Sequence, residues 1–370
     1  MQVKQYPFFI KSTVILFGII LLTYSLINLR DILVPIAFAV IISILLNRLV
    51  NRFKRSGISN VFSIIIAMLI ALTVICGILY FLSSQMIGFG DNLPLLKSKF
   101  GSLLHELQQW LKVKFGLAID KQVQLLNEAL NNSKAVLGKT VGTALGTLAV
   151  VFLLPVYVFL LLFYKALILN FLYEVFSEEN TTQVGDILNQ TKTAIQSYMV
   201  GLLLEALIVA VLNSIALLIL GVDYAILLGV IGAILNMIPY LGGIVAIALP
   251  VLMATVTKDG FSTQLGIIIA YAIIQFVDNN ILVPRIVSSK VQINALFSIL
   301  VVLFGGALWG VPGMFLSIPG VAILKIIFDR IDDLKPWGKL LGDEVPTRHK
   351  GQTWIRRRKK KSVAEEIMEQ

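Results

Sequence analysis

The stretch that decides the fold class is VFSIIIAMLIALTVICGILYFLSSQM, residues 61–86, which contains no charged side chain. A helix needs about 20 apolar residues to cross the hydrocarbon core of a bilayer, so this run is long enough for one span. Apolar and polar residues do not alternate in it, as they would in a membrane-spanning β-strand. The run therefore predicts a transmembrane α-helix.

Similar runs follow one another along most of the chain. Of its 370 residues, 57% are hydrophobic and 14% are charged, and the mean hydropathy is +0.88. A soluble protein cannot bury that much apolar surface. Apolar spans are expected near 12–29, 32–47, 61–86, 139–164, 200–221, 224–257, 263–283 and 295–328. We therefore predict an all-α polytopic membrane protein with about eight transmembrane helices.

Basic residues predict which helix ends face the cytoplasm, because positively charged loops stay on that side. Residues 48–55, after the second span, contain four Lys or Arg, and residues 335–370 contain ten Lys or Arg against five Asp or Glu. Eight crossings place both segments and both termini in the cytoplasm. The tail is expected to contact anionic membrane lipid. Nucleic-acid binding is the alternative, but beside the basic run 356–361 only Trp354 is aromatic, so no nucleic-acid partner is expected.

Hydropathy divides the chain into four regions. Residues 1–86 form N-terminal transmembrane helices, 139–330 form a C-terminal transmembrane region, and 331–370 form the basic cytoplasmic tail. Residues 87–138 differ in kind, because apolar side chains recur there at helical spacing among charged ones. They predict an insertion of amphipathic helices outside the membrane.

The C-terminal transmembrane region contains residues that break helices. Residues 236–243, NMIPYLGG, interrupt the apolar run 224–257, and the last span is rich in Gly and Pro. Irregular backbone at membrane depth is tolerated where protein or a water-filled cavity satisfies it. We therefore expect broken or re-entrant segments lining a pathway, with Pro239 and Gly242 in non-helical backbone. The predicted breakers are Pro239, Tyr240, Gly242, Gly243, Pro284, Gly310, Pro312 and Gly313.

Few ionisable groups fall inside the predicted spans. Glu205 lies about one turn into its span, on one helical stripe with Tyr198, and Asp278 shares a stripe with Tyr271 and Gln275. A buried carboxylate in a membrane is costly, so it usually faces a partner, a cavity or a pathway. The candidate pathway residues are Asp278, Glu205, Gln275, Asn279, Asn280 and Arg285.

Each acid also has a purely structural explanation. Glu205 could extend its carboxylate to the membrane interface. Asp278 could form an ion pair with Arg285 or Lys290. These alternatives stay open at the level of sequence.

Catalytic chemistry finds little support in the sequence. His105 and His349 both fall outside the expected spans, and Cys76 is the only cysteine. No nucleophile–base pair, metal-binding cluster or phosphate-binding glycine loop is recognisable. We expect no enzyme activity, no cofactor and no metal site.

Four blocks in the C-terminal half resemble the AI-2E transporter family. They are GVDYA at 221–225, IPYLG at 238–242, the segment 278–285 with its Asp-Asn-Asn and Pro-Arg steps, and the Gly- and Pro-rich segment 305–319. The resemblance implies a multispan transporter of the bacterial inner membrane that assembles into homo-oligomers. It also implies export of the quorum-sensing signal autoinducer-2, or sodium–proton exchange as credited to other members.

The chain departs from the family at one informative place. The family often has Leu-His-Pro after the Pro-Arg block, where this chain reads Ile293-Asn294-Ala295. A candidate proton carrier is therefore missing.

We predict a transporter that exports a small solute such as autoinducer-2. A cation–proton antiporter is the alternative within transport, and an oligomeric membrane scaffold is the alternative of another class. Transport predicts water access to Asp278, whereas a scaffold predicts a dry, ion-paired Asp278 and partner binding through residues 87–138.

Overall fold

The computed structural model describes residues 7–91, 93–115, 144–176, 181–238, 242–258, 260–287 and 293–343. Every regular element in these ranges is a helix, which confirms the all-α prediction. Among the described residues, six helices are long and apolar enough to cross a membrane, and a bent pair makes up to seven. Two shorter apolar helices divide the run 224–257, which was expected to be broken.

The first three helices are α1 (Phe8–Asn28), α2 (Arg30–Arg55) and α3 (Asn60–Asp91). Only Leu29 separates α1 from α2, and a turn with Gly57 at φ +87° separates α2 from α3. The helix α6 (Ala144–Phe163) packs with α2 and α3 around one apolar cluster. The short helix α7 (Lys165–Val175) follows α6 at a bend of 63°.

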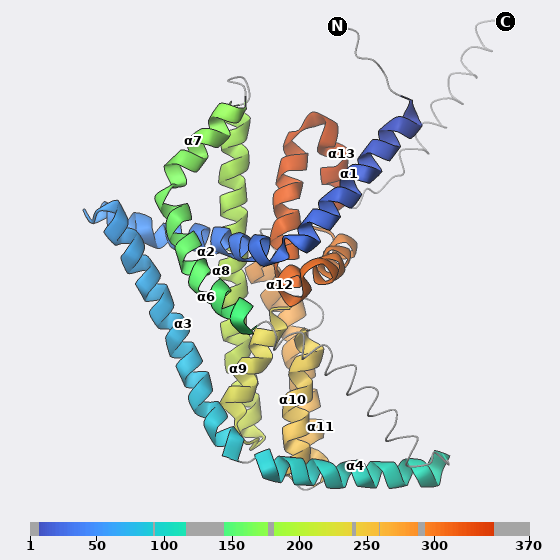
Figure 1. Cartoon of the computed structure of the whole chain (residues 1–370). Helices are drawn as coiled ribbons and strands as arrows, with labels where there is room; N and C mark the ends of the chain where they lie inside the picture. Colours follow the sequence, from blue (N-terminus) through green and yellow to red (C-terminus); the bar gives the residue numbers. More distant parts are fainter. Residues whose placement is uncertain are drawn as a thin grey trace, which may run out of the picture.

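An amphipathic helix lies across one end of the molecule. This helix, α4 (Leu93–Phe115), lies crosswise beneath α10 and α11 (Figure 1). Its Trp110 and Val113 side chains are exposed. A helix is therefore present in part of the region 87–138, and its placement outside the membrane stays a prediction. The second amphipathic helix, expected around 123–131, lies outside the described residues, as does the basic tail beyond 343.

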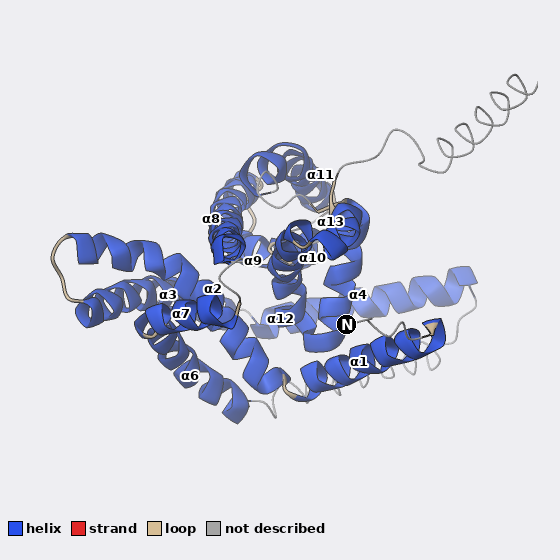
Figure 2. Cartoon of the chain, turned by 90° about the horizontal axis from the view of Figure 1, so that it is seen from above, coloured by secondary structure: helices blue, strands red, loops and turns tan. Residues whose placement is uncertain are grey.

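The helix α8 (Thr181–Ile219) is the longest element and organises the C-terminal region. At 1.5 Å per residue it extends about 58 Å, roughly twice the thickness of a hydrocarbon core. Against it pack α9 (Ala225–Asn236) and α11 (Ser262–Val277), while α10 (Gly242–Thr257) packs on α9 and α11, and the four helices share an apolar core. Figure 2 shows these four helices as one group, with α3, α6 and α7 gathered around α2 to one side.

The break between α9 and α10 is shorter than predicted. Gly242 is the first residue of α10, and its amide donates to the Ile238 carbonyl oxygen, so it is helical. A Cβ there would lie 1.9 Å from the Leu235 carbonyl oxygen, which explains why a glycine occupies this position. The predictions for Pro239 and Tyr240 lie outside the described residues.

The last long element, α12 (Ala295–Arg330), is sharply broken, as the sequence predicted. Gly310 adopts φ 65° and ψ −145°, a conformation that side-chain-bearing residues avoid. The chain turns back there, so that a Cβ on Gly305 would lie 2.4 Å from the Gly313 carbonyl oxygen. Beyond it follow a 3₁₀ turn, η4 (Asp332–Leu334), and the helix α13 (Lys335–Leu341), which packs on α12.

Candidate functional site

The side chain of Asp278 is the centre of a buried polar cluster. Asp278 stands where α11 ends and a π-helical segment, η2 (Asp278–Val287), begins, and it is 2% exposed. Wider π-helical turns are rare and recur at functional sites. The local change of helix type therefore points the Asp278 carboxylate into the packed interior of the group α8–α11.

Amide side chains hold one oxygen of this carboxylate. Asn236, at the last residue of α9, donates its Nδ2–H to Asp278 Oδ2 at 2.9 Å. Gln275 Nε2 lies 3.4 Å from the same oxygen and donates to Asn279 Oδ1 at 3.2 Å. Residues from two other helices, α9 and α11, thus converge on Asp278.

A second carboxyl group reaches the cluster from α8. Glu205 is 5% exposed, and it lies close enough to Asp278 for the two carboxyl groups to interact. Two ionised carboxylates in contact repel each other strongly where water is excluded. A shared proton or a bound cation would relieve this repulsion, which makes the pair a candidate site for either.

A small cavity adjoins the Asp278 carboxyl group. Its volume is about 10 Å³, which is room for roughly one water molecule. Three buried oxygens here have no hydrogen-bond partner among the described residues: Asn213 Oδ1, Tyr271 Oη and Asp278 Oδ1. Buried polar atoms without partners are costly, and clustered oxygens are the ligands that hard cations prefer. No group of three or more His, Cys, Asp or Glu that could hold a metal occurs in the described part of the chain.

Glycines allow the helices to approach this cavity closely. A Cβ on Gly243 would lie 2.4 Å from Gln275 Oε1, and one on Gly232 would lie 3.3 Å from Asn213 Nδ2. Side chains at these two positions would displace the amides around Asp278.

The structure brings some of the predicted residues together and separates others. Asp278, Glu205, Gln275 and Asn279 form one connected set. Asn280 is exposed and donates to the Phe276 carbonyl oxygen of its own helix. Gly310, Pro312 and Gly313 belong to α12, and none of them lines the cavity beside Asp278.

Two of the structural alternatives for the acids are wrong in the described residues: an interfacial Glu205 and an Asp278–Arg285 ion pair. The Glu205 side chain is buried and faces Asp278, so it does not extend to the membrane interface. Arg285 is exposed and forms no ion pair with Asp278. Lys290 lies outside the described residues.

Two members of the cluster were not among the predicted site residues. Asn213 follows Glu205 by about two helical turns on α8, and Asn236 begins the helix-breaking stretch. Both are amides within apolar runs, and that signal could have identified them. Their convergence on Asp278 depends on how α8, α9 and α11 pack.

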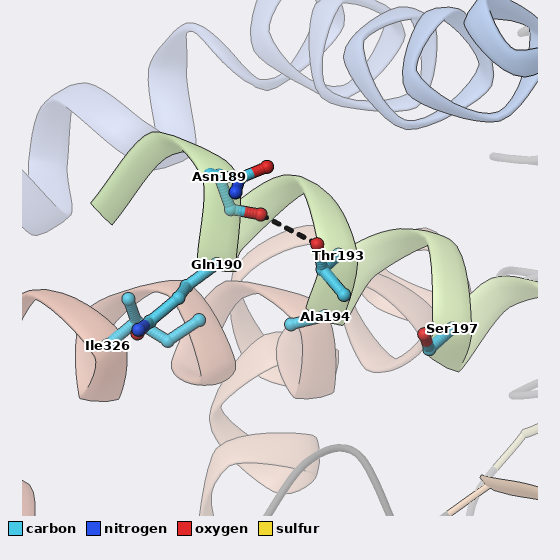
Figure 3. Close-up of a pocket in the computed structure, with 6 residues that line it drawn as sticks. All are labelled: Asn189, Gln190, Thr193, Ala194, Ser197 and Ile326. Atoms are coloured by element: carbon cyan, nitrogen blue, oxygen red, sulfur yellow. Dashed lines mark hydrogen bonds between the residues drawn. The ribbon is translucent and has the colours of Figure 1, made fainter. Parts of the chain in front are cut away.

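A larger polar pocket lies elsewhere on α8. It has a volume of about 300 Å³ and is formed by the polar first half of α8 and by α12 (Figure 3). Thr193 donates its hydroxyl to the Asn189 carbonyl oxygen at its edge, at 2.8 Å. The lining residues are Asn189, Gln190, Thr193, Ala194, Ser197 and Ile326.

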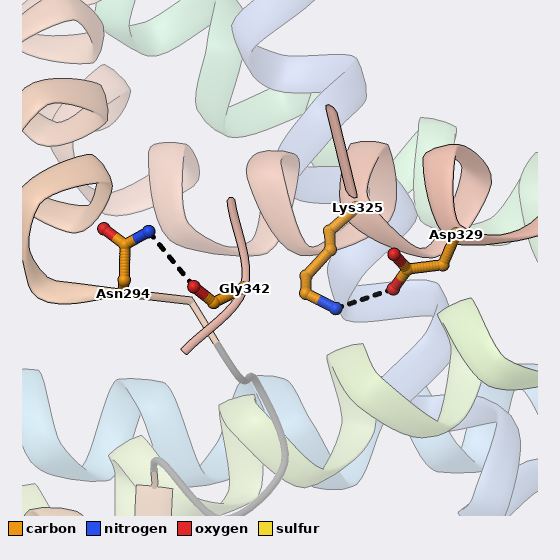
Figure 4. A network of polar contacts seen from close by, with 4 residues as sticks. All are labelled: Asn294, Lys325, Asp329 and Gly342. Carbon is orange, nitrogen blue, oxygen red and sulfur yellow. Dashed lines mark hydrogen bonds and ion pairs between the residues drawn. The ribbon is translucent and has the colours of Figure 1, made fainter. Parts of the chain in front are cut away.

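The position where the family often has histidine performs a structural task here. Asn294 Oδ1 accepts a hydrogen bond from the Phe297 amide at the start of α12. Its Nδ2 donates to the Leu340 carbonyl oxygen at 2.8 Å and to the Gly342 carbonyl oxygen at 3.1 Å, and Figure 4 shows the second of these bonds. Nearby, Lys325 and Asp329 pair at 2.6 Å. Asn294 thus caps α12 and fastens the end of α13 to it, rather than contributing to the cluster around Asp278.

The fold and its apolar helices define the class: this is a multi-pass helical membrane protein. The sequence model of the family described as "AI-2E family transporter" matches residues 13–333 of this chain. The chain belongs to the AI-2E transporter family.

Its relatives are named as transport proteins. The "AI-2 transport protein TqsA" of Escherichia coli (strain K12) is 26% identical over 85% of this chain and 90% of its own length. The "Putative transport protein YrrI" of Bacillus subtilis (strain 168) is 25% identical over 81% of this chain and 86% of its own length. Because the matches cover most of both chains, the chain is a membrane transporter by family.

Proposed function

We propose that this protein exports a small solute such as autoinducer-2, through a pathway built by α8, α9, α10 and α11. Family membership supports transport, and the name of the Escherichia coli relative suggests the solute. We place the protein in the bacterial inner membrane with both termini in the cytoplasm, because the basic segments then lie on the side that the positive-inside rule requires.

One observation carries the proposal: two neighbouring carboxyl groups lie buried beside a small cavity, on which three oxygens without partners among the described residues converge. In a lipid-embedded protein, polar groups at broken helix ends are typical of substrate and ion sites. In this proposal Asp278 and Glu205 carry the charge of the site, and Gln275 orients Asp278. Asn279 extends the polar surface outward, because it is exposed and accepts a hydrogen bond from Gln275. Asn280 and Arg285 border that exposed side.

A specific observation favours cation–proton antiport as a second candidate. The cavity beside Asp278 holds about one water, which suits a small cation or a proton better than an organic solute. Two adjacent carboxyl groups could exchange a proton for a cation without changing the net charge of the site. A solute exporter would need this region to open further.

Assembly into a homo-oligomer belongs to the same proposal. In α1, none of the most apolar window is buried within the chain, so this helix is free to face lipid or a second copy. Helices that face other copies commonly form the periphery of a single subunit.

Flux through the purified full-length chain in liposomes tests the proposal. Liposomes are loaded with autoinducer-2 or with sodium, with and without a pH gradient, and efflux is compared with that of protein-free liposomes. Autoinducer-2 efflux that depends on the protein supports solute export. Sodium flux driven by the pH gradient alone supports antiport. Absence of both fluxes contradicts transport by this chain and favours the scaffold.

A further inference from the structure

A cleft with several positive charges lies between α2 and α8, away from the cluster around Asp278. Its volume is about 620 Å³. Arg48, Arg52 and Arg55 are four and three residues apart, so they share one face of α2. Lys192 and Gln196 are four residues apart on α8 and form the opposing wall. The lining residues are Asn47, Arg48, Asn51, Arg52, Arg55, Ser56, Lys192 and Gln196.

Within the described part of the chain, no ion pair neutralises the positive charge of this cleft. No acidic residue lines it. The ion pairs among the described residues are Arg30–Asp31, Lys325–Asp329, Arg330–Asp186 and Lys335–Asp332, and none involves a cation of the cleft. Lys165 adds a further cation beside it, since its Nζ donates to Asn47 Oδ1 at 3.2 Å. Clustered like charges raise the local potential and attract an anion.

Hydrogen bonds hold the two walls in place before any anion binds. Gln196 Nε2 donates to the Ile44 carbonyl oxygen at 2.7 Å, which ties α8 to α2. Asn47 is buried, and its bond to Lys165 ties α2 to α7. A site whose supporting helices are already fixed loses less entropy on binding.

We propose that this cleft binds a phosphate group. Arginine side chains present planar forks of N–H donors that match phosphate oxygens, and lysine adds a point charge. Phosphate is shared by the headgroups of anionic lipids and by small soluble phosphates. The position of the cleft favours a lipid headgroup, because the arginines lie in the last turns of α2. This helix is apolar enough to span a membrane, so its basic end is expected near the membrane surface.

Binding of labelled phosphatidylglycerol to the full-length protein in neutral detergent micelles tests the site, with phosphatidylcholine as the neutral comparison. We expect saturable binding of phosphatidylglycerol only. Arg52→Gln should weaken it about tenfold, since a charge-assisted hydrogen bond and a nearby charge are lost. Lys192→Gln, on the opposite wall, should weaken it as well. Lys54→Gln is the matched control, because it removes one charge from the same end of α2 but does not line the cleft.

Competition with inorganic phosphate separates the two sources. Displacement of the lipid by phosphate, with the same sensitivity to Arg52→Gln, assigns the cleft to soluble phosphates. Binding of lipid that phosphate does not displace assigns it to the headgroup. The proposal is overturned if neither probe binds saturably, or if Arg52→Gln and Lys54→Gln weaken binding equally. The melting temperature of each variant shows whether it is folded.

Discussion

The Asp278 carboxylate has amide donors on one oxygen and a second carboxyl group, that of Glu205, close by. No basic side chain among the described residues forms an ion pair with it. A carboxylate that only stabilised the fold would be expected to pair with a basic side chain, as Asp186 does with Arg330. Two carboxyl groups placed side by side lower the free energy of unfolding, so this arrangement indicates a functional role rather than a stabilising one. The predictions at this scale therefore concern activity more than folding.

Asp278→Asn should lower flux at least about tenfold and leave the melting temperature unchanged or higher. Asparagine keeps the shape and one oxygen acceptor, but it removes the charge and the repulsion with Glu205. Flux in liposomes and thermal unfolding in detergent measure the two effects. Asp223→Asn, the same change at an exposed loop position, is the control. Normal flux in the Asp278 variant would leave the cluster without a transport role.

Gly243→Ala should reduce flux while lowering stability only slightly. The added methyl group would lie 2.4 Å from Gln275 Oε1, so this flexible side chain must move away and give up its contact with Asp278. Gly77→Ala is the control, since no atom of the chain lies within 4 Å of its added Cβ. Equal flux in both variants would show that the position of Gln275 is unimportant.

At the scale of elements, breaks within helices decide the architecture. The run 224–257 divides into α9 and α10, which allows Asn236 to end a helix and turn its side chain to Asp278. In α12, the reversal at Gly310 brings the two halves together at Gly305 and Gly313. Trp309, beside this reversal, donates to the Leu26 carbonyl oxygen and so connects α12 to α1.

Gly310→Ala should lower the free energy of unfolding by about 1–3 kcal/mol, because its backbone conformation is one that alanine adopts only under strain. Gly320→Ala, later in the same helix, is the matched control: its φ is negative, and its added Cβ meets no atom within 4 Å. Thermal unfolding of both variants in one detergent measures the difference. If the two variants melt together, Gly310 is not strained.

At the scale of the whole molecule, the two ends differ in chemistry. The amphipathic α4 lies at one end, and α7, α13 and the polar first half of α8 lie at the other (Figure 1). The described helices between these ends are mostly apolar. A bilayer placed between them separates α4 from the polar ends of α8 and α13.

Cysteine labelling in intact cells should report the same arrangement. In a Cys76→Ala background, Ser56→Cys and Gln352→Cys are expected to resist a membrane-impermeant reagent until the cells are permeabilised, because both follow basic segments. Gln109→Cys in α4 should be labelled from outside and serves as the positive control. Strong external labelling at position 56 or 352 would contradict eight crossings.

Local properties of the chain were enough to predict the helical membrane fold, the amphipathic character of α4 and the break in α12. Hydropathy is a property of each residue, and clustered glycine and proline residues weaken a helix locally, so these features can be predicted without knowing how the helices pack. The choice of Asp278 and Glu205 followed from the same reasoning, since charges are rare inside apolar runs.

Only the tertiary structure decided which polar groups meet. Glu205, Asn236 and Asp278 lie on three helices far apart in sequence, and helical periodicity describes each face without saying which faces pack together. Packing also placed Arg285 away from Asp278 and brought α2 and α8 together around the basic cleft. Such contacts depend on the angles and separations of whole helices, which small residues such as Gly232 and Gly243 permit but do not by themselves specify.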